Sequence, residues 1–136
     1  MSKFDKNFFL LADYASTDRD GKLMINGVFE TIYAQSVPAL HQTLYLVGSV
    51  MVDDKDIQSA NVDLDILDSK GNSIVENKIP TLKVSLPKYN DRKRNFNIIY
   101  QLNSVKLSNY GEHKIAVKVN GKDLASASFF VDKPSN

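Results

Sequence analysis

The feature that most constrains this chain is the alternation of apolar and polar residues with a period of two. In residues 61–68, Val62, Leu64 and Ile66 lie on one face and polar residues lie on the other. The same alternation recurs in residues 43–53, 96–103 and 114–119. Successive side chains of a β-strand point to opposite faces of a sheet, so this period predicts half-buried strands. The sequence therefore predicts an all-β fold.

Turn residues separate the predicted strands. The pair Asn120-Gly121 favours a type I′ hairpin turn, since both central positions of that turn need a positive φ. Gly71 follows the alternating run of residues 62–67 and predicts a hairpin to a further strand over residues 74–79. We expect about eight or nine short strands in a two-sheet antiparallel β-sandwich.

Two predicted strands carry expectations about their place in a sheet. Pro80 and Pro87 flank residues 82–86, which predicts a short edge strand, because proline cannot donate to a sheet ladder. The first strand, over residues 8–15, is apolar on both faces. It is therefore expected either inside a sheet or buried by a homodimer.

One short segment narrows the fold further. The run Asn109-Tyr110-Gly111-Glu112-His113-Lys114-Ile115 resembles the D-x-G-x-Y-x-C approach to strand F of immunoglobulin domains. Asn109 stands for the aspartate, His113 for the corner tyrosine and Ile115 for the cysteine. The segment predicts an immunoglobulin-like Greek key and carries no functional information.

The 136 residues suit one domain over residues 1–133 with a short tail at 134–136. The absence of cysteine and of any long apolar run predicts a cytoplasmic protein with no membrane span. Charge is uneven: residues 1–68 hold five Lys/Arg against eleven Asp/Glu, net −6, and residues 69–136 hold twelve against five, net +7. This division indicates either a charged partner or head-to-tail association, unless folding scatters the charges.

Chemistry-bearing residues are few. His41 and His113 are the two histidines, and neither has the spacing of a zinc site or lies near a nucleophile motif. Two acidic loops, residues 18–20 and 53–56, are interpreted as turns rather than calcium sites. The basic segment of residues 88–94 is interpreted as a solvated loop, because a net charge of +1 argues against nucleic acid. The sequence thus predicts no cofactor and no metal.

A longer pattern indicates a relationship. It runs through Leu11-Ala12-Asp13-Tyr14-Ala15, Asp20-Gly21-Lys22-Leu23 and Asn26-Gly27-Val28-Phe29, and continues to Val37-Pro38-Ala39-Leu40-His41. In these residues the chain resembles a family of small bacterial proteins of unknown function, which implies a bacterial or phage-associated β-sandwich and supplies no catalytic residue. The candidate cluster, either a binding site or a folding constraint, is Asp13, Tyr14, Asn26 and His41.

These observations favour a non-enzymatic binding or assembly module that acts on a protein partner or on a second copy of itself. One alternative is a small-ligand or carbohydrate-binding sandwich, with sugar platforms at Tyr33, Tyr45, Tyr89 and Tyr110. Another is a hydrolase that uses paired carboxylates.

Overall fold

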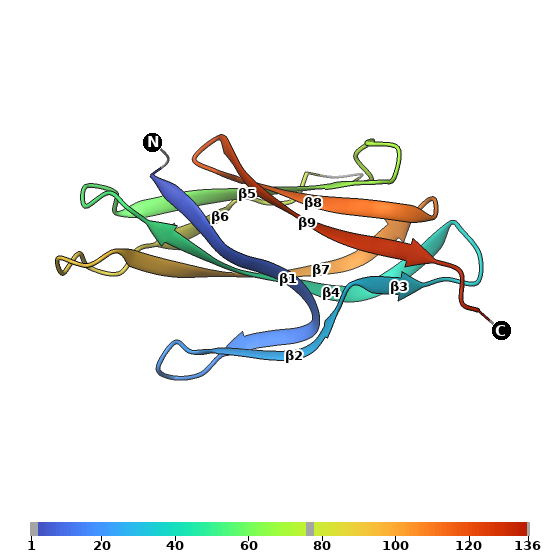
Figure 1. Cartoon of the computed structure of the whole chain (residues 1–136), viewed down its shortest axis with the longest axis horizontal. Helices are drawn as coiled ribbons and strands as arrows, with labels where there is room; N and C mark the ends of the chain where they lie inside the picture. The colour runs from blue at the N-terminus through green and yellow to red at the C-terminus, as the bar shows by residue number, and fades with distance from the viewer. Residues whose placement is uncertain (1–2, 76–77, 136) are drawn as a thin grey trace.

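The computed structural model describes residues 3–75 and 78–135, and the regular structure in these ranges is entirely β-strand. Sheet A has the strand order β2-β1-β4-β7, and sheet B has the order β3-β9-β8-β5-β6 (Figure 1). The nine strands are β1 Phe4–Thr17, β2 Leu23–Phe29, β3 Thr31–Tyr33, β4 Ala39–Val52, β5 Ser59–Leu67, β6 Leu82–Ser85, β7 Arg94–Leu107, β8 Gly111–Val119 and β9 Lys122–Asp132. The predicted all-β fold with two sheets is confirmed. The expectation of purely antiparallel pairing is wrong at β3, which runs parallel to β9.

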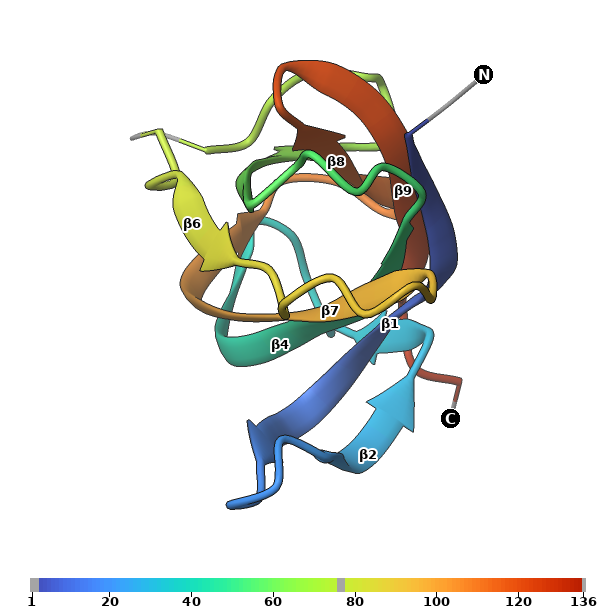
Figure 2. The same ribbon diagram turned by 90° about the vertical axis from the view of Figure 1, so that its left-hand side faces the viewer.

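The main core lies between the two sheets, which curve around it in the end-on view of Figure 2. Leu46 and Ile98 enter it from sheet A, while Val117 and Phe129 enter it from sheet B. All four side chains are at most 1% exposed. Each such side chain contributes roughly 1.5–3 kcal/mol of transfer free energy, so this alternating inner layer is what stabilises the fold.

A second, smaller core lies on the outer face of sheet A. β2 forms a hairpin with the second half of β1, and this hairpin bends under β4 and β7 (Figure 1). Ala12 and Ala15 of β1 pack there against Val47 of β4, and all three are buried. At the hairpin tip, the Asn97 side chain donates to the backbone oxygen of Gly21 (3.5 Å). The hairpin thus covers the outer face of β4 around Val47.

The strand placements predicted from proline and from apolar faces are confirmed. β6 is the edge strand of sheet B, and β1 lies inside sheet A between β2 and β4. The strand predicted over residues 74–79 is wrong where it is described: only an isolated bridge between Leu67 and Ser73 follows the turn. Ile74, Val75 and Ile79 instead turn their side chains toward the core, and residues 76–77 of that prediction lie outside the described residues.

The corner segment contains a buried histidine. His113 is 0% exposed, and its ring lies 5.1 Å from that of Phe129. Its Nδ1 lies 3.1 Å from the backbone oxygen of Gly111, and because a carbonyl can only accept, Nδ1 is the protonated nitrogen. Nε2 has no hydrogen-bond partner among the described residues. The neighbouring Tyr110 hydroxyl donates to the backbone oxygen of Ala34 (2.9 Å), which ties this corner to the chain that follows β3.

The turn between β8 and β9 has the predicted geometry. Asn120 has a φ of 51° and Gly121 a φ of 81°, as a type I′ turn requires. A Cβ added at Gly121 would meet no atom within 4 Å, so only the backbone conformation disfavours a side chain there.

Replacing Gly121 with valine is expected to lower the free energy of unfolding by roughly 1–2 kcal/mol, because a β-branched residue resists positive φ. Urea unfolding of the wild type and of Gly121→Val measures this difference. The adjacent substitution Lys122→Val, on the exposed first residue of β9, is the control and should leave the midpoint nearly unchanged. An unchanged midpoint for Gly121→Val would contradict the turn assignment.

Candidate functional site

Three residues of the candidate cluster lie on the β1–β2 hairpin. Tyr14 is directly opposite Asn26 in the ladder, and the Asp13 carboxylate lies over Gly27, where an added Cβ would come within 2.4 Å of Oδ2. Gly27 has no Cβ, which allows this close approach, and its φ of 72° is one that glycine adopts readily. His41 lies elsewhere, with its ring 6.2 Å from that of Phe29 at the end of β2. Within the described ranges, no hydrogen bond or ion pair joins the four side chains to one another.

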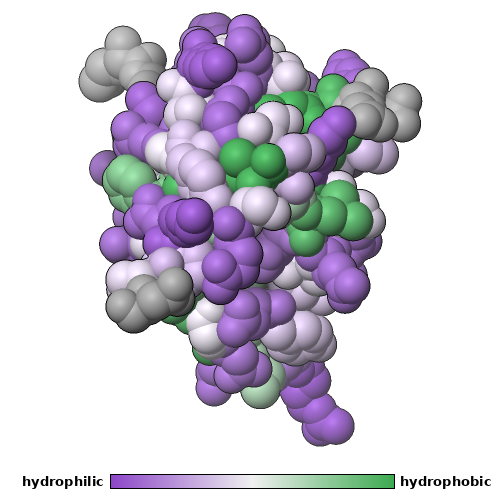
Figure 3. Space-filling model, turned by 90° about the vertical axis from the view of Figure 1, so that its right-hand side faces the viewer, coloured by the Kyte–Doolittle hydropathy of each residue, from purple (hydrophilic) through white to green (hydrophobic). Residues whose placement is uncertain are grey.

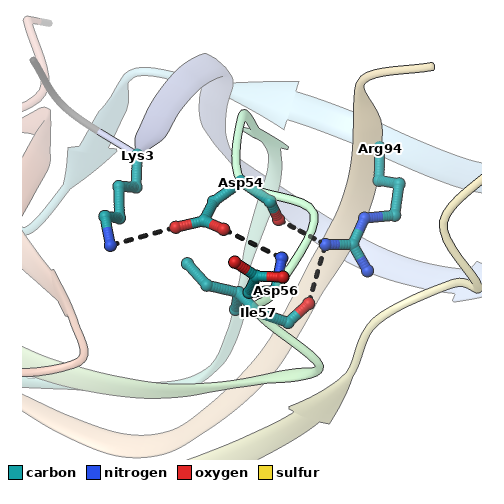
Figure 4. A network of polar contacts seen from close by, with 5 residues as sticks. All are labelled: Lys3, Asp54, Asp56, Ile57 and Arg94. Carbon is teal, nitrogen blue, oxygen red and sulfur yellow. Dashed lines mark hydrogen bonds and ion pairs between the residues drawn. The ribbon is translucent and has the colours of Figure 1, made fainter. Parts of the chain in front are cut away.

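The two acidic loops hold their own backbone. Asp18 Oδ1 accepts hydrogen bonds from the backbone N–H groups of Asp20 (2.8 Å) and Lys22 (2.9 Å). Asp54 Oδ1 accepts from the N–H of Asp56 (2.8 Å), and its Oδ2 pairs with Lys3 Nζ (3.0 Å; Figure 4). These contacts are those of turn-forming aspartates.

The hydrogen bond from the Asp56 N–H, followed by the one from Lys3, lowers the pKa of Asp54 below its ordinary value of 3.8. A carboxyl whose pKa is lowered in the folded state adds stability above its unfolded pKa and loses it as pH falls through the folded value. We therefore expect the wild type to lose stability below about pH 4 more steeply than Asp54→Asn. Thermal unfolding from pH 6 to pH 2.5 measures both slopes, and identical slopes would contradict this role of Asp54.

The basic segment of residues 88–94 ends in a buried arginine. Arg94 is 6% exposed, and its guanidinium donates to the backbone oxygens of Pro87 (3.0 Å), Asp54 (2.6 Å) and Ile57 (2.7 Å). Figure 4 shows the two bonds to the 54–57 loop. The Tyr89 ring lies 5.8 Å from its Cζ. Arg94 therefore fixes two loops at the start of β7 and is not available to a nucleic acid. The sequence did not separate this buried arginine from the other basic residues of the segment.

The tyrosines considered as sugar platforms do not share one surface. Tyr33 is 66% exposed at β3, whereas Tyr89 lies in the loop before β7, at the opposite end of the strands in Figure 1. Tyr45 packs edge-on against Tyr14, and Tyr110 is held by its bond to Ala34. The end of the molecule at which β3 lies has small, separate hydrophobic areas (Figure 3).

A groove of about 600 Å³ opens along the side of the molecule, between β7 and the chain that precedes β6. We call it the β7 groove. β7 and β6 are the last strands of their sheets and lie on the same side in Figure 2. The lining residues are Leu40, Ile66, Ile74, Val75, Lys78, Ile79, Pro80, Tyr100, Gln101, Leu102, Asn103, Ser104, Val105 and Lys106.

The floor of the β7 groove is apolar. Ile66, Ile79, Leu102 and Val105 belong to the main core and are at most 8% exposed, so the groove reaches down to the core. Tyr100 spans it, since its hydroxyl donates to the backbone oxygen of Pro80. Burial raises the pKa of Tyr100 above its ordinary value of 10.0, and the Asp63 charge adds to the effect, so the phenol stays a donor at neutral pH.

One wall of the groove is a strand edge with free backbone groups. The Asp53 N–H donates to the backbone oxygen of Lys3, so the backbone groups of Asp53 point toward β1. The N–H and C=O groups of the preceding residue, Val52, therefore point in the opposite direction, toward its partner Arg94 in β7. Backbone groups alternate in direction along a strand. The odd-numbered residues of β7 from Asn95 to Asn103 therefore direct their N–H and C=O groups to the free edge. No backbone hydrogen bond connects that edge to another described residue.

The charged lining residues that the structure describes have one sign. They are Lys78, on the chain that precedes β6, and Lys106, near the end of β7. Both belong to the second half of the chain, which carries a net charge of +7. The sequence predicted that asymmetry and a strand over residues 74–79. The groove itself depends on which strand lies at the edge of the sheet, and alternation does not encode that.

Comparisons with known proteins place the fold and leave the activity open. A family model described as a family of unknown function (DUF6941) matches residues 7–132. No curated protein matches. Among solved structures, the chain is similar to the Pseudomonas fluorescens alkylpurine DNA glycosylase AlkC bound to DNA containing an abasic site analog, at 14% identity and a TM-score of 0.53, over 96% of this chain and 31% of that one. It is also similar to the Listeria innocua β-glucosidase in complex with isofagomine, at 10% identity and a TM-score of 0.50, over 95% of this chain and 17% of that one.

The chain thus spans about a third of the glycosylase and about a sixth of the glucosidase. At these identities the similarity concerns the fold alone. Of the described residues, none forms a helix that is long and apolar enough to cross a membrane.

Proposed function

The chain belongs to this family of unknown function, and we propose that it is a non-enzymatic binding module that takes an extended segment of a partner protein as an added strand on β7. The observation that carries the proposal is the free edge of β7 beside an apolar groove. In β-strand addition, backbone hydrogen bonds at an open edge supply affinity, and pockets for alternate side chains supply specificity. The β7 groove offers both.

The strand order supports an immunoglobulin-like reading of this edge. Aligned with that fold, β1, β4 and β7 correspond to strands A, B and E, and β9, β8, β5 and β6 to strands G, F, C and C′. In constant-type immunoglobulin domains, strand D pairs with the free edge of strand E. The corresponding position here is the free edge of β7, so an added strand would complete a known sheet.

The surroundings of the chemistry-bearing side chains support a non-enzymatic role. Asp18 and Asp54 bind the backbone of their own loops, and His113 is enclosed beside Phe129. A cytoplasmic location, proposed from the cysteine-free sequence, suits a module that binds other proteins.

Proline at Gln101 tests strand addition. The Gln101 N–H faces the free edge, so proline there removes a donor for an added strand and spares the ladder with β4. Peptides selected from a random display library on the wild type are expected to lose binding to Gln101→Pro and to keep it on Gln101→Ala. Fluorescence anisotropy measures both, and circular dichroism verifies the fold of each variant. Equal binding to the two variants would contradict strand addition.

A further inference from the structure

We propose that the segment bound in the β7 groove is acidic and extended, with apolar residues at every second position. This inference rests on the proposed function and adds the chemistry of the occupant. It follows from three features: the backbone edge, the apolar floor and the sign of the lining charges.

The edge fixes the conformation of the occupant. Free N–H and C=O groups recur at every second residue from Asn95 to Asn103, and only an extended chain can pair with such a row. Beyond this stretch Ser104 has a φ of 56° and has no ladder partner in β4, so the regular edge ends there. An added strand would turn alternate side chains toward the buried Leu102 and Ile79 and the others toward water. Apolar residues at every second position satisfy this geometry.

The lining charges fix the sign of the occupant. Lys78 and Lys106 both line the groove, and none of the other lining residues that the structure describes is an aspartate or a glutamate. Positively charged walls favour an anionic chain and disfavour a cationic one. The free backbone edge favours a peptide over a nucleic acid, because a sugar–phosphate backbone has no N–H and C=O groups at the spacing of a β-strand.

A second copy of the chain fits this edge poorly. Two β7 strands paired antiparallel around Ile99 would bring Lys106, beyond the end of the regular edge in one copy, toward Arg92, just before β7 in the other copy, and like charges that approach each other disfavour that pairing. Both side chains are exposed, and neither forms an ion pair with another described residue. The same charges attract an acidic segment from a different protein.

The other edges are protected or short. β6 has four residues and lies between Pro80 and Pro87, and β3 has three residues. β2 has seven residues, half the length of β7. Short or proline-flanked strands offer less edge to another chain. β7, with 14 residues, is the edge on which the described chain best supports an added strand.

The experiment uses the full-length chain and three synthetic nine-residue peptides. In the first, valine and glutamate alternate; in the second, the same residues are arranged in two blocks; in the third, lysine replaces glutamate. Fluorescence anisotropy at 50 mM and 300 mM salt gives the affinity of each peptide. Sedimentation velocity of the free protein gives its oligomeric state.

The acidic alternating peptide is expected to bind at least about tenfold more tightly than the lysine peptide and the block peptide, and to weaken at high salt. The double substitution Lys78→Glu, Lys106→Glu should reverse the preference toward the lysine peptide. Equal binding of the acidic and lysine peptides, or a dimer that Gln101→Pro dissociates, would overturn the inference.

The outcomes also separate this inference from the proposed function. If the lysine peptide binds as well as the acidic one and Gln101→Pro abolishes both, strand addition stands and the acidic occupant is wrong. If no alternating peptide binds, strand addition fails with it. Should Gln101→Pro not fold, an acidic peptide N-methylated at alternate residues replaces it, and binding undiminished by the lost N–H donors would contradict edge pairing.

Discussion

Replacing Arg94 with methionine is expected to lower the free energy of unfolding by about 3–5 kcal/mol. The guanidinium donates to three backbone oxygens, and methionine would leave these acceptors without their charged donor in a buried place. Arg94→Lys should recover part of the loss, because an ammonium keeps the charge and lacks the planar fork. Urea unfolding at pH 7 measures all three proteins.

The matched control is Arg92→Met, since Arg92 is exposed two residues earlier in the same basic segment. It should change the free energy of unfolding by about 0.5 kcal/mol or less. A loss of under about 1 kcal/mol for Arg94→Met would contradict the role of Arg94 in fixing the two loops.

Replacing Phe129 with alanine should cost about 3–5 kcal/mol, whereas replacing Phe130 should cost about 1 kcal/mol or less. Phe129 is 0% exposed and packs against His113, while Phe130 is 41% exposed on the opposite face of β9. The pair isolates burial from residue type, because the two side chains are identical and adjacent. Thermal and urea unfolding measure both, and equal losses would contradict the register of β9 against β8.

The alternation of apolar and polar residues predicted most of the fold, because a half-buried strand has apolar residues on its inner face and polar residues on its outer face. It found the strand containing Val62 and Ile66, and glycine and proline located the turn at Gly121 and the edge strand β6. It failed at Ile74 and Ile79. These two side chains lie five positions apart, so a regular strand would turn them to opposite faces, yet both contact the core from the chain that lines the β7 groove.

The groove itself could not be predicted locally. An edge strand and a central strand with one covered face show the same alternation of apolar and polar residues. The sequence of β7 therefore does not reveal that it lies at an edge. Arg94 is one of several basic residues in a run, and only the fold separates the buried guanidinium from the exposed Arg92. Ser104 has a positive φ, which the sequence does not indicate because the residue is not a glycine. The family pattern includes Tyr14 and other residues of the hairpin that covers sheet A.

Hydrogen exchange of the β7 amides, measured by NMR, tests the central claim most directly. In the free protein, the amides of Ile99 and Gln101 should exchange quickly, and those of Ile98 and Tyr100, which face β4, should exchange slowly. Saturating the protein with the acidic alternating peptide should slow Ile99 and Gln101 and leave Ile98 and Tyr100 unchanged. Strand addition on β7 is contradicted if the odd-numbered amides are already protected in the free monomer, or if the peptide binds and leaves them as fast as before.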